Sequence, residues 1–477
     1  MSNKLIDFRN QHLNSISDSF CAAKWYNASI HLGHGYTGSC HLPLPHPIDK
    51  DEILINPSAI HNTTHKKNMR KMMLEGTKPA ECSYCWKVED MGSESVSDRV
   101  YKSQIYNVND IRKIKDIGWE KDVNLKTLEI SFDRQCNFAC SYCNAAYSST
   151  WAKDLETNGP YQNFVAGSGG GGAYQSDGKW AELNGRQMDN NPYVDAFFKW
   201  WPELSLTLEE LRITGGEATV SQNFWRFVDI LEKTPSPNLR FAVNSNLGCG
   251  EKAMQNLIDI THKLPIKEFD LYTSNESFGA HAEYIRDGLD YQVWRNNLIN
   301  FIENAKFRAV TIMMTINSLC LFSIDTFLDD MLELKAKYGA HRPNVDINLL
   351  RWPNFMSPVA LPDDIKMELH AKLSKWYETN KDSPLLNLGE KNQFQRLLDY
   401  IRVVDKGHVY TTDNKDELFH DFKSFHEQYD KRRGKNFLET FPELTKWYSS
   451  IEVRPVFPII EMHSEGIRHY ETGEYKK

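Results

Sequence analysis

Two adjoining stretches decide the fold of this chain: Leu125-Lys-Thr-Leu-Glu-Ile-Ser-Phe-Asp133 and, shortly after it, Cys136-Asn-Phe-Ala-Cys140-Ser-Tyr-Cys143. The first alternates apolar and polar residues, and this pattern predicts a strand. The second has the spacing C-x3-C-x2-C, which brings three thiols together in one tight loop. We therefore expect a loop with metal-binding chemistry directly after a strand.

Three cysteines this close together favour an iron–sulfur cluster. A four-iron cluster is usually held by four thiolates, so a loop with three leaves one iron open to bind a small molecule. The alternatives are a zinc knuckle or a chance cluster of buried thiols. Zinc sites usually combine two C-x2-C pairs, or one pair with two histidines, and the spacing here fits both patterns poorly.

The wider sequence predicts an α/β fold, because short β-branched runs alternate with amphipathic helical segments between residues 122 and 355. The six predicted strands are Leu125–Asp133, Glu209–Thr214, Leu239–Asn244, Lys267–Thr273, Ala309–Ile316 and Val345–Leu350. The cysteine loop then lies at the C-terminal edge of a parallel sheet, which is the chemical face of βα barrels. Six strands in place of eight predict a partial, open (β/α)6 barrel of the TIM type.

The cysteine loop, with Tyr142 before its last cysteine, resembles the signature loop of the radical S-adenosylmethionine (radical SAM) superfamily. The resemblance covers roughly residues 36–350. It implies a 4Fe-4S cluster on Cys136, Cys140 and Cys143 that reductively cleaves S-adenosyl-L-methionine to give a 5′-deoxyadenosyl radical. That radical takes a hydrogen atom from a substrate, and an electron donor such as a flavodoxin or ferredoxin reduces the cluster. The substrate expected first is a peptide or protein, followed by a small molecule or sugar.

Further residues match the cofactor-binding elements of this family. The predicted second strand ends in Thr214-Gly215-Gly216-Glu217, which the resemblance assigns to the methionyl amino group; a plain βα turn is the alternative. Asn244 and Ser245, after the third strand, match a ribose-binding run, although simple turn chemistry explains them equally well.

The fourth predicted strand and the segment after it supply two more candidates. Ser274 matches a serine near the ribose or the methionyl carboxylate, and Arg286 matches the arginine near that carboxylate. A guanidinium is the natural bidentate partner of a carboxylate. Asn317, after the fifth strand, is a weaker candidate for contact with adenosine.

A second cysteine group precedes the barrel. Cys40, followed by Cys82 and Cys85 in Glu81-Cys-Ser-Tyr-Cys-Trp86, resembles the twitch or SPASM auxiliary-cluster modules. Such modules usually carry another cysteine before the C-x2-C pair, which this chain lacks. Three interpretations are possible for this group: an auxiliary iron–sulfur cluster, a zinc site with a further ligand such as His41 or His46, and a degenerate module without metal.

The remaining cysteines are expected outside these sites. Cys21 and Cys320 sit among apolar neighbours and are predicted to be core thiols. Cys249 follows the third strand on the chemical face. We favour a structural role for this thiol over contact with the substrate.

The predicted domains are a twitch-like segment at 1–121, the radical SAM partial barrel at 122–355 and a mostly helical region at 356–477. Within the barrel, Gly167–Gly172 predicts a flexible surface insertion, with a mobile lid as the alternative. In the last region, Phe441–Leu444 and Trp447–Tyr448 are expected to pack a helix against the barrel.

Composition argues against several classes of protein. The chain has 477 residues and a net charge of −8, which argues against nucleic-acid binding. We expect no signal peptide and no membrane span. Nine cysteines, an odd number, argue against a secreted disulfide framework and favour the cytoplasm. The rival hypothesis is a non-catalytic iron–sulfur or zinc-binding interaction or electron-transfer protein, and the Gly-Gly-Glu turn with Arg286 argues against it.

Overall fold

The computed structural model describes residues 2–92, 94–166, 172–175, 191–402 and 414–454. The glycine run predicted as a flexible insertion lies, at 167–171, outside the described residues. In the ranges described, nine strands form one sheet in the order β11-β10-β8-β7-β6-β4-β1-β2-β3. Their bounds are β1 (Asn27–His31), β2 (Tyr36–Gly38), β3 (His46–Pro47), β4 (Thr127–Ser131), β6 (Glu210–Thr214), β7 (Ser236–Ser245), β8 (Ile266–Ser274), β10 (Ala309–Ile316) and β11 (Asn344–Leu349).

The sheet is mostly parallel, which confirms the predicted α/β class. All neighbours from β11 to β1 run parallel, and only the pairs β1–β2 and β2–β3 are antiparallel. The six predicted strands are present as β4, β6, β7, β8, β10 and β11. Among the described residues, β11 and β3 are the edge strands of the sheet and do not pair with each other.

A seventh parallel strand comes from the segment predicted as an N-terminal module. β1 pairs with β4 from Asn27 opposite Thr127 to His31 opposite Ser131. The strand that leads into the cysteine loop therefore lies inside the sheet, with a neighbour on each side. The helices around β1 are α1 (Ser2–Phe8), α2 (Ala23–Tyr26), α3 (Lys50–Ile55), α4 (Thr64–Leu74), α5 (Ser83–Asp90), α6 (Asp98–Ser103) and α7 (Val108–Ile117).

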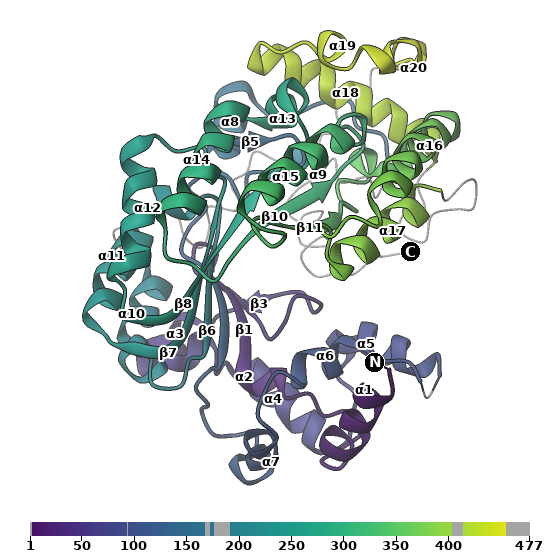
Figure 1. Cartoon of the computed structure of the whole chain (residues 1–477). Coiled ribbons are helices and arrows are strands. Elements are labelled where there is room, and N and C mark those ends of the chain that lie inside the picture. The colour runs from purple at the N-terminus through teal and green to yellow at the C-terminus, as the bar shows by residue number, and fades with distance from the viewer. Residues whose placement is uncertain (1, 93, 167–171, 176–190, 403–413, 455–477) are drawn as a thin grey trace.

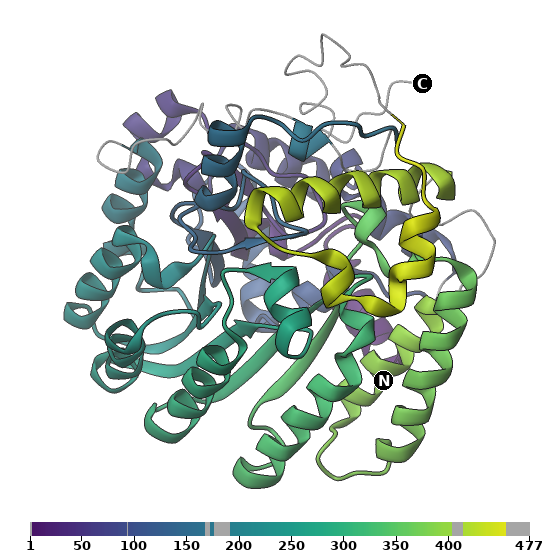
Figure 2. The ribbon, with the colours of Figure 1, turned by 90° about the horizontal axis from the view of Figure 1, so that it is seen from above.

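One face of the sheet is covered by the helices that connect its strands: α10 (Pro192–Leu204), α11 (Gln222–Lys233), α12 (Glu251–Lys263), α14 (Tyr291–Asn304) and α15 (Ile324–Tyr338). Figure 1 shows α10, α11 and α12 together on one side of the strands, and Figure 2 shows the teal and green helices in an arc outside them. The helix α11 follows the predicted pattern, because Ser221 caps its N-terminus and Phe224, Phe227 and Leu231 are buried.

The strands divide their side chains between two unlike faces. In β4, Leu128 and Ile130 are buried in the main hydrophobic core, whereas Glu129 on the opposite face is only partly buried. In β6, Leu211 and Ile213 alternate in the same way with the partly exposed Arg212. The face turned away from the core therefore carries charged and polar side chains.

Beyond β11, the described residues form helices but no strand, as predicted: α16 (Asp363–Asn380), α17 (Leu388–Ile401), α18 (Lys415–Arg433), α19 (Phe437–Thr440) and α20 (Thr445–Ser450). Phe441 stacks on His281 of α13 (Gly279–Ile285) at 4.6 Å, and Tyr448 stacks on Phe437 at 4.3 Å. The first stack packs the C-terminal region against α13, as predicted for Phe441, whereas the second lies within the C-terminal region itself. Each helix in the described part of the chain is too short or too polar to cross a membrane.

Candidate functional site

The cysteine loop begins just beyond the C-terminal end of β4. The backbone N–H of Cys136 donates to Ser149 Oγ at 3.1 Å, and the Cys136 carbonyl accepts from Thr150 Oγ1 at 2.6 Å. Both partners belong to α8 (Ser149–Asn158), which follows the loop. Trp151 of the same helix donates from Nε1 to the Cys140 carbonyl at 2.9 Å. These hydrogen bonds fix the cysteine loop to α8, the helix that follows it in the sequence.

A two-stranded ribbon fixes the other side of the loop. β5 (Ala139–Cys140) pairs antiparallel with β9 (Arg286–Asp287), with Cys140 opposite Arg286 and Ala139 opposite Asp287. Arg286 Nη1 lies 3.9 Å from Cys140 Sγ. The structure therefore brings together two residues that the same family resemblance assigned to the cofactor site from distant segments of the sequence.

Three glycines let neighbouring turns approach the cysteine loop. A Cβ on Gly216 would lie 2.3 Å from the carbonyl oxygen of Gln135, and one on Gly248 would lie 2.2 Å from the ring of Phe138. Gly288, which has φ +103°, would place a Cβ 2.7 Å from the same ring. Any side chain at these three positions would push a turn away from the loop.

Glu217, predicted to bind an ammonium group, is buried and already engaged inside the protein. Its Oε1 accepts from the backbone N–H of Thr219 at 3.0 Å and from the hydroxyl of Thr219 at 2.6 Å. Its Oε2 accepts from the backbone N–H of Asn246 at 2.5 Å. Burial raises the pKa of this carboxyl, and these hydrogen bonds lower it in part. In this arrangement Glu217 joins the ends of β6 and β7, and the turn backbone at Gly215–Gly216 is the part left for a ligand.

Arg286 forms a buried ion pair that the sequence analysis missed. Its Nε lies 3.1 Å from Oε2 of Glu276, two residues beyond β8, and both side chains are almost fully buried. Glu276 Oε1 accepts from the hydroxyl of Tyr142 at 3.2 Å and from Nδ2 of Asn317 at 3.4 Å. Burial opposes the charge of Arg286, but the negative charge of Glu276 more than offsets this and raises the arginine pKa. Glu276 thus links the cysteine loop to the ends of two strands.

The remaining predicted residues lie along the same edge. Asn244 accepts at Oδ1 from Arg212 Nε at 2.9 Å, and Ser245 accepts at Oγ from the backbone N–H of Leu247 at 3.1 Å. Ser274 is the last residue of β8 and is partly exposed. Cys249 is partly buried near Glu217, and Cys320 is fully buried, as expected of a core thiol.

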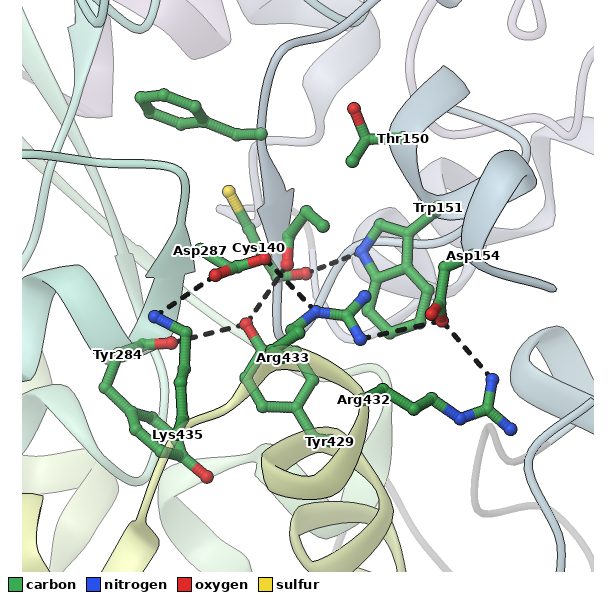
Figure 3. Close-up of polar contacts among 12 residues, drawn as sticks. Cys140, Thr150, Trp151, Asp154, Tyr284, Asp287, Tyr429, Arg432, Arg433 and Lys435 are labelled. Carbon is green, nitrogen blue, oxygen red and sulfur yellow. Dashed lines mark hydrogen bonds and ion pairs between the residues drawn. The ribbon is translucent and has the colours of Figure 1, made fainter. Parts of the chain in front are cut away.

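Helix α18 supports the cysteine ribbon from outside (Figure 3). The hydroxyl of Tyr429 donates to the carbonyl of Ala139 at 3.1 Å. Arg433 Nε pairs with Asp287 at 3.2 Å, and its guanidinium lies 4.4 Å from the ring centroids of both Trp151 and Tyr429. The C-terminal region, which the sequence left without a role, therefore contacts the loop that carries Cys140.

A second group of cysteines lines a cavity in the N-terminal part. Cys40, Cys82 and Cys85, predicted as an auxiliary site, share this cavity with Cys21, which was predicted to be a core thiol. Among the described residues that line it, neither His41 nor His46 is present. His46 instead contacts Thr63 Oγ1 at 2.9 Å. Cys21, which precedes Cys40 in the sequence, is thus a fourth cysteine around this cavity.

The cations that line this cavity are largely paired with carboxylates. Lys24, Arg99 and Lys102 line it together with Asp98, but Lys24 pairs with Glu81 and Arg99 with Glu89. The chemistry of the donor set is the observation that bears on a metal here, because four sulfurs suit a zinc ion or a four-iron cluster.

Three of these thiols, Cys136, Cys82 and Cys85, are protonated as they stand. Burial raises the pKa of Cys136, Cys82 and Cys85 to about 12 each. In the described part of the chain, no three or more His, Cys, Asp or Glu side chains converge closely enough to hold a metal ion. Metal binding at either group therefore requires rotation about the cysteine side-chain torsions and loss of protons, both of which are ordinary for thiolate sites.

The arrangement suits one-electron chemistry at an iron–sulfur cluster. Three thiols stand at the C-terminal edge of a parallel sheet, where glycines let neighbouring turns pack closely against the loop and a buried arginine lies beside a sulfur. With the open loop, this donor set fits a four-iron cluster with one iron free. Comparisons of the chain with family models, with curated proteins and with solved structures found no match.

Proposed function

We propose that this protein is a radical SAM enzyme built on a partial (β/α)6 barrel of the TIM type. The observation that carries the proposal is the contact between Cys140 and Arg286, which joins the cysteine loop to a second motif of the same family. When bound at Cys136, Cys140 and Cys143, the 4Fe-4S cluster with S-adenosyl-L-methionine supplies reductive carbon–sulfur cleavage and a 5′-deoxyadenosyl radical that abstracts hydrogen from a substrate.

The chain's own residues bind and orient the reactants. The backbone of Gly215 and Gly216 is free of side chains at the strand edge and provides carbonyl oxygens for the methionyl ammonium group. Glu217 holds that turn in place through Thr219 and the backbone of Asn246. Asn244, Ser245 and Ser274 lie along the same edge, where their polar groups suit the ribose.

Arg286 and Glu276 act as one buried unit. Because Glu276 already neutralises the guanidinium, a methionyl carboxylate would share the arginine with Glu276 and not replace it. Glu276 also holds Tyr142 and Asn317, so the pair sets the position of the loop between Cys140 and Cys143.

The test uses protein reconstituted without oxygen and supplied with dithionite and S-adenosyl-L-methionine. We expect 5′-deoxyadenosine from the wild type and none from a Cys136/Cys140/Cys143→Ala variant. A wild type with a reducible cluster that neither binds nor cleaves S-adenosyl-L-methionine would favour the rival hypothesis of an iron–sulfur interaction or electron-transfer protein. The peptide or protein substrate, the flavodoxin or ferredoxin donor and the cytoplasmic location stay predictions.

A second metal site is favoured by one specific observation, the four cysteines around the N-terminal cavity. We propose that Cys21, Cys40, Cys82 and Cys85 hold an auxiliary iron–sulfur cluster, with zinc as the alternative. Metal analysis of the Cys136/Cys140/Cys143→Ala variant distinguishes an iron–sulfur cluster from zinc, because this variant retains only the N-terminal group of cysteines. Iron with sulfide supports the cluster, zinc supports the alternative, and absence of both metals would mean a module without metal.

A further inference from the structure

Two opposite charges lie side by side on the face of the sheet turned away from the main core, and they do not pair with each other. Glu129 of β4 and Arg212 of β6 are Cα partners in the parallel register. Their side chains therefore leave the same face of adjacent strands, which run about 4.8 Å apart. Both are partly exposed, and among the described residues no ion pair within 4.0 Å joins them.

Each charge is turned toward a different neighbour. Arg212 Nε donates to Asn244 Oδ1 at 2.9 Å, and its guanidinium carbon lies 4.0 Å from the ring centroid of Tyr272. Glu129 Oε1 accepts from Ser29 Oγ at 3.4 Å. The guanidinium thus leans toward β7 and β8, whereas the carboxylate leans toward β1. The two charges are held apart although their strands are neighbours.

Other charges on the same face do pair. Glu210 pairs with Arg240, one level lower, and Arg240 Nε also lies 3.6 Å from Asp270. Arg308 pairs with Asp270 and lies 3.4 Å from Glu268. Asp270 shares the register level of Glu129 and Arg212, because Arg212 is opposite Ala242 and Ala242 is opposite Asp270. The separation of charges therefore concerns Glu129 and Arg212 themselves and not a whole level of the sheet.

We propose that Glu129 and Arg212 together bind a substrate that carries an ammonium group and a carboxylate, as a free amino acid or a short peptide does. This inference rests on the proposed radical SAM function. A guanidinium whose Nε is held by an amide offers its two terminal nitrogens to a carboxylate in bidentate geometry. The carboxylate of Glu129 pairs with the ammonium group.

The position of the two charges suits a substrate and not the cofactor. Glu129 and Arg212 each lie two residues before the end of their strand, at Ser131 and Thr214. Two residues of strand correspond to roughly 7 Å. A ligand held there lies beneath the Gly215–Gly216 turn and the cysteine loop, on the side from which a radical at the strand edge can reach it.

The test measures binding of small probes by ligand-observed saturation-transfer NMR, with the full chain reconstituted anaerobically. The zwitterionic probes are L-alanine, dialanine and trialanine, and their relative affinities distinguish a free amino acid from a peptide. N-acetyl-L-alanine carries only the negative charge, and L-alaninamide carries only the positive charge. We expect the wild type to bind at least one zwitterion tenfold or more tightly than either blocked probe.

Two variants assign the charges. Arg212→Gln should weaken binding of the zwitterion and of N-acetylalanine at least tenfold and leave binding of alaninamide unchanged. Glu129→Gln should weaken binding of the zwitterion and of alaninamide at least tenfold and leave binding of N-acetylalanine unchanged. Glu268→Gln is the matched control, because it removes a carboxylate on the same face that Arg308 already engages. The inference would be overturned if either variant lost affinity for every probe equally. It would also be overturned if the wild type bound blocked and zwitterionic probes equally well.

Saturating S-adenosyl-L-methionine should leave probe binding intact. Displacement of the probe would mean that the two charges hold the cofactor's own amino-acid group, and the substrate assignment would fall. Measuring 5′-deoxyadenosine on the same samples keeps the two proposals separate. Deoxyadenosine without probe binding overturns only this inference, whereas probe binding without deoxyadenosine under any condition overturns only the proposed function.

Discussion

Arg433 of α18 pairs with Asp287 of β9, with 3.2 Å between Nε and Oδ2, and so ties the C-terminal helix to the strand that holds the cysteine loop. Asp287 is opposite Ala139 in that ribbon, one residue from Cys140. The same guanidinium lies 3.5 Å from Asp154 of α8, the helix that fixes the other side of the loop. One buried side chain thus joins three segments around the candidate site.

Replacing Arg433 with Met should loosen this junction. Removing one partner of a buried ion pair usually costs about 3–5 kcal/mol. Here Lys435 still pairs with Asp287 and Arg432 with Asp154, so we expect a smaller loss of about 2 kcal/mol in unfolding free energy. Urea denaturation measures it, and iron per chain should fall as well. Lys431→Met, which removes an exposed cation from the same helix, is the control; equal effects of the two changes would contradict the role of Arg433.

Gly216→Ala should separate the Gly-Gly-Glu turn from the cysteine loop. The added methyl would lie 2.3 Å from the Gln135 carbonyl and 2.7 Å from the Arg134 carbonyl, so the backbone must shift. We expect a cost of about 1–3 kcal/mol and weaker binding of S-adenosyl-L-methionine, measured by denaturation and calorimetry. Gly250→Ala is matched to it, because its Cβ would meet no atom within 4 Å and its φ is −71°. A Gly216→Ala protein with unchanged cofactor affinity would argue against a close approach of the ligand to this turn.

Cys21→Ser tests whether the N-terminal cavity is a four-thiolate site. In the background of the Cys136/Cys140/Cys143→Ala variant, we expect Cys21→Ser to lower bound metal as strongly as Cys82→Ser does, since either change leaves three sulfurs. Cys320→Ser is the control, because that thiol is buried elsewhere and donates to the Asn317 carbonyl at 3.2 Å, which a hydroxyl can also do. Full metal content in the Cys21→Ser protein would mean that Cys21 is a core thiol and not a metal ligand.

His426 should make the fold sensitive to acid. The imidazole is fully buried, and burial lowers its pKa from 6.5 to about 3. Between these values the unfolded chain binds a proton that the folded protein does not, so stability is lost as pH falls below 6.5. At pH 5 the loss from this one group is about 2 kcal/mol.

His426→Phe removes that contribution. Among the described residues its Nε2 has no hydrogen-bond partner, and Tyr284 keeps its bond to Asp430 at 2.7 Å, so the substitution leaves no new unpaired polar atom. Unfolding free energies at pH 7 and pH 5 should differ by about 2 kcal/mol less in the variant than in the wild type. Identical pH dependence of the two proteins would show that the folded state already accommodates the charged ring.

The strands were predictable because each is a local pattern bounded by turn residues. All six predicted strands are present, and the polar residues after four of them meet at one edge. β1 was missed because five residues, Asn27–His31, carry too weak an alternation to stand out from a cysteine-bearing segment. Its place beside β4 depends on pairing between residues a hundred positions apart, which no local pattern records.

The candidate site was predictable as a set of residues but not as a set of contacts. Motif spacing identified Arg286 and Glu217, yet it could not show that Glu276 occupies the guanidinium or that the Asn246 amide occupies the Glu217 carboxylate. The Glu276 carboxylate, next to a strand end that carries Ser274, was the available signal. Cys21 was interpreted from its apolar neighbours in sequence, whereas its cavity is built by segments around Cys40 and Cys82.

The bond between Tyr429 and Ala139 has a consequence for biosynthesis. The two residues are 290 positions apart in the chain, so the ribosome completes the cysteine loop long before the helix that contacts it. At elongation rates of 5–20 residues per second, this interval lasts roughly 15–60 s. During that time the nascent loop lacks the hydrogen bond from Tyr429 to the Ala139 carbonyl, so the ribbon that carries Cys140 gains this support only after α18 has been synthesised.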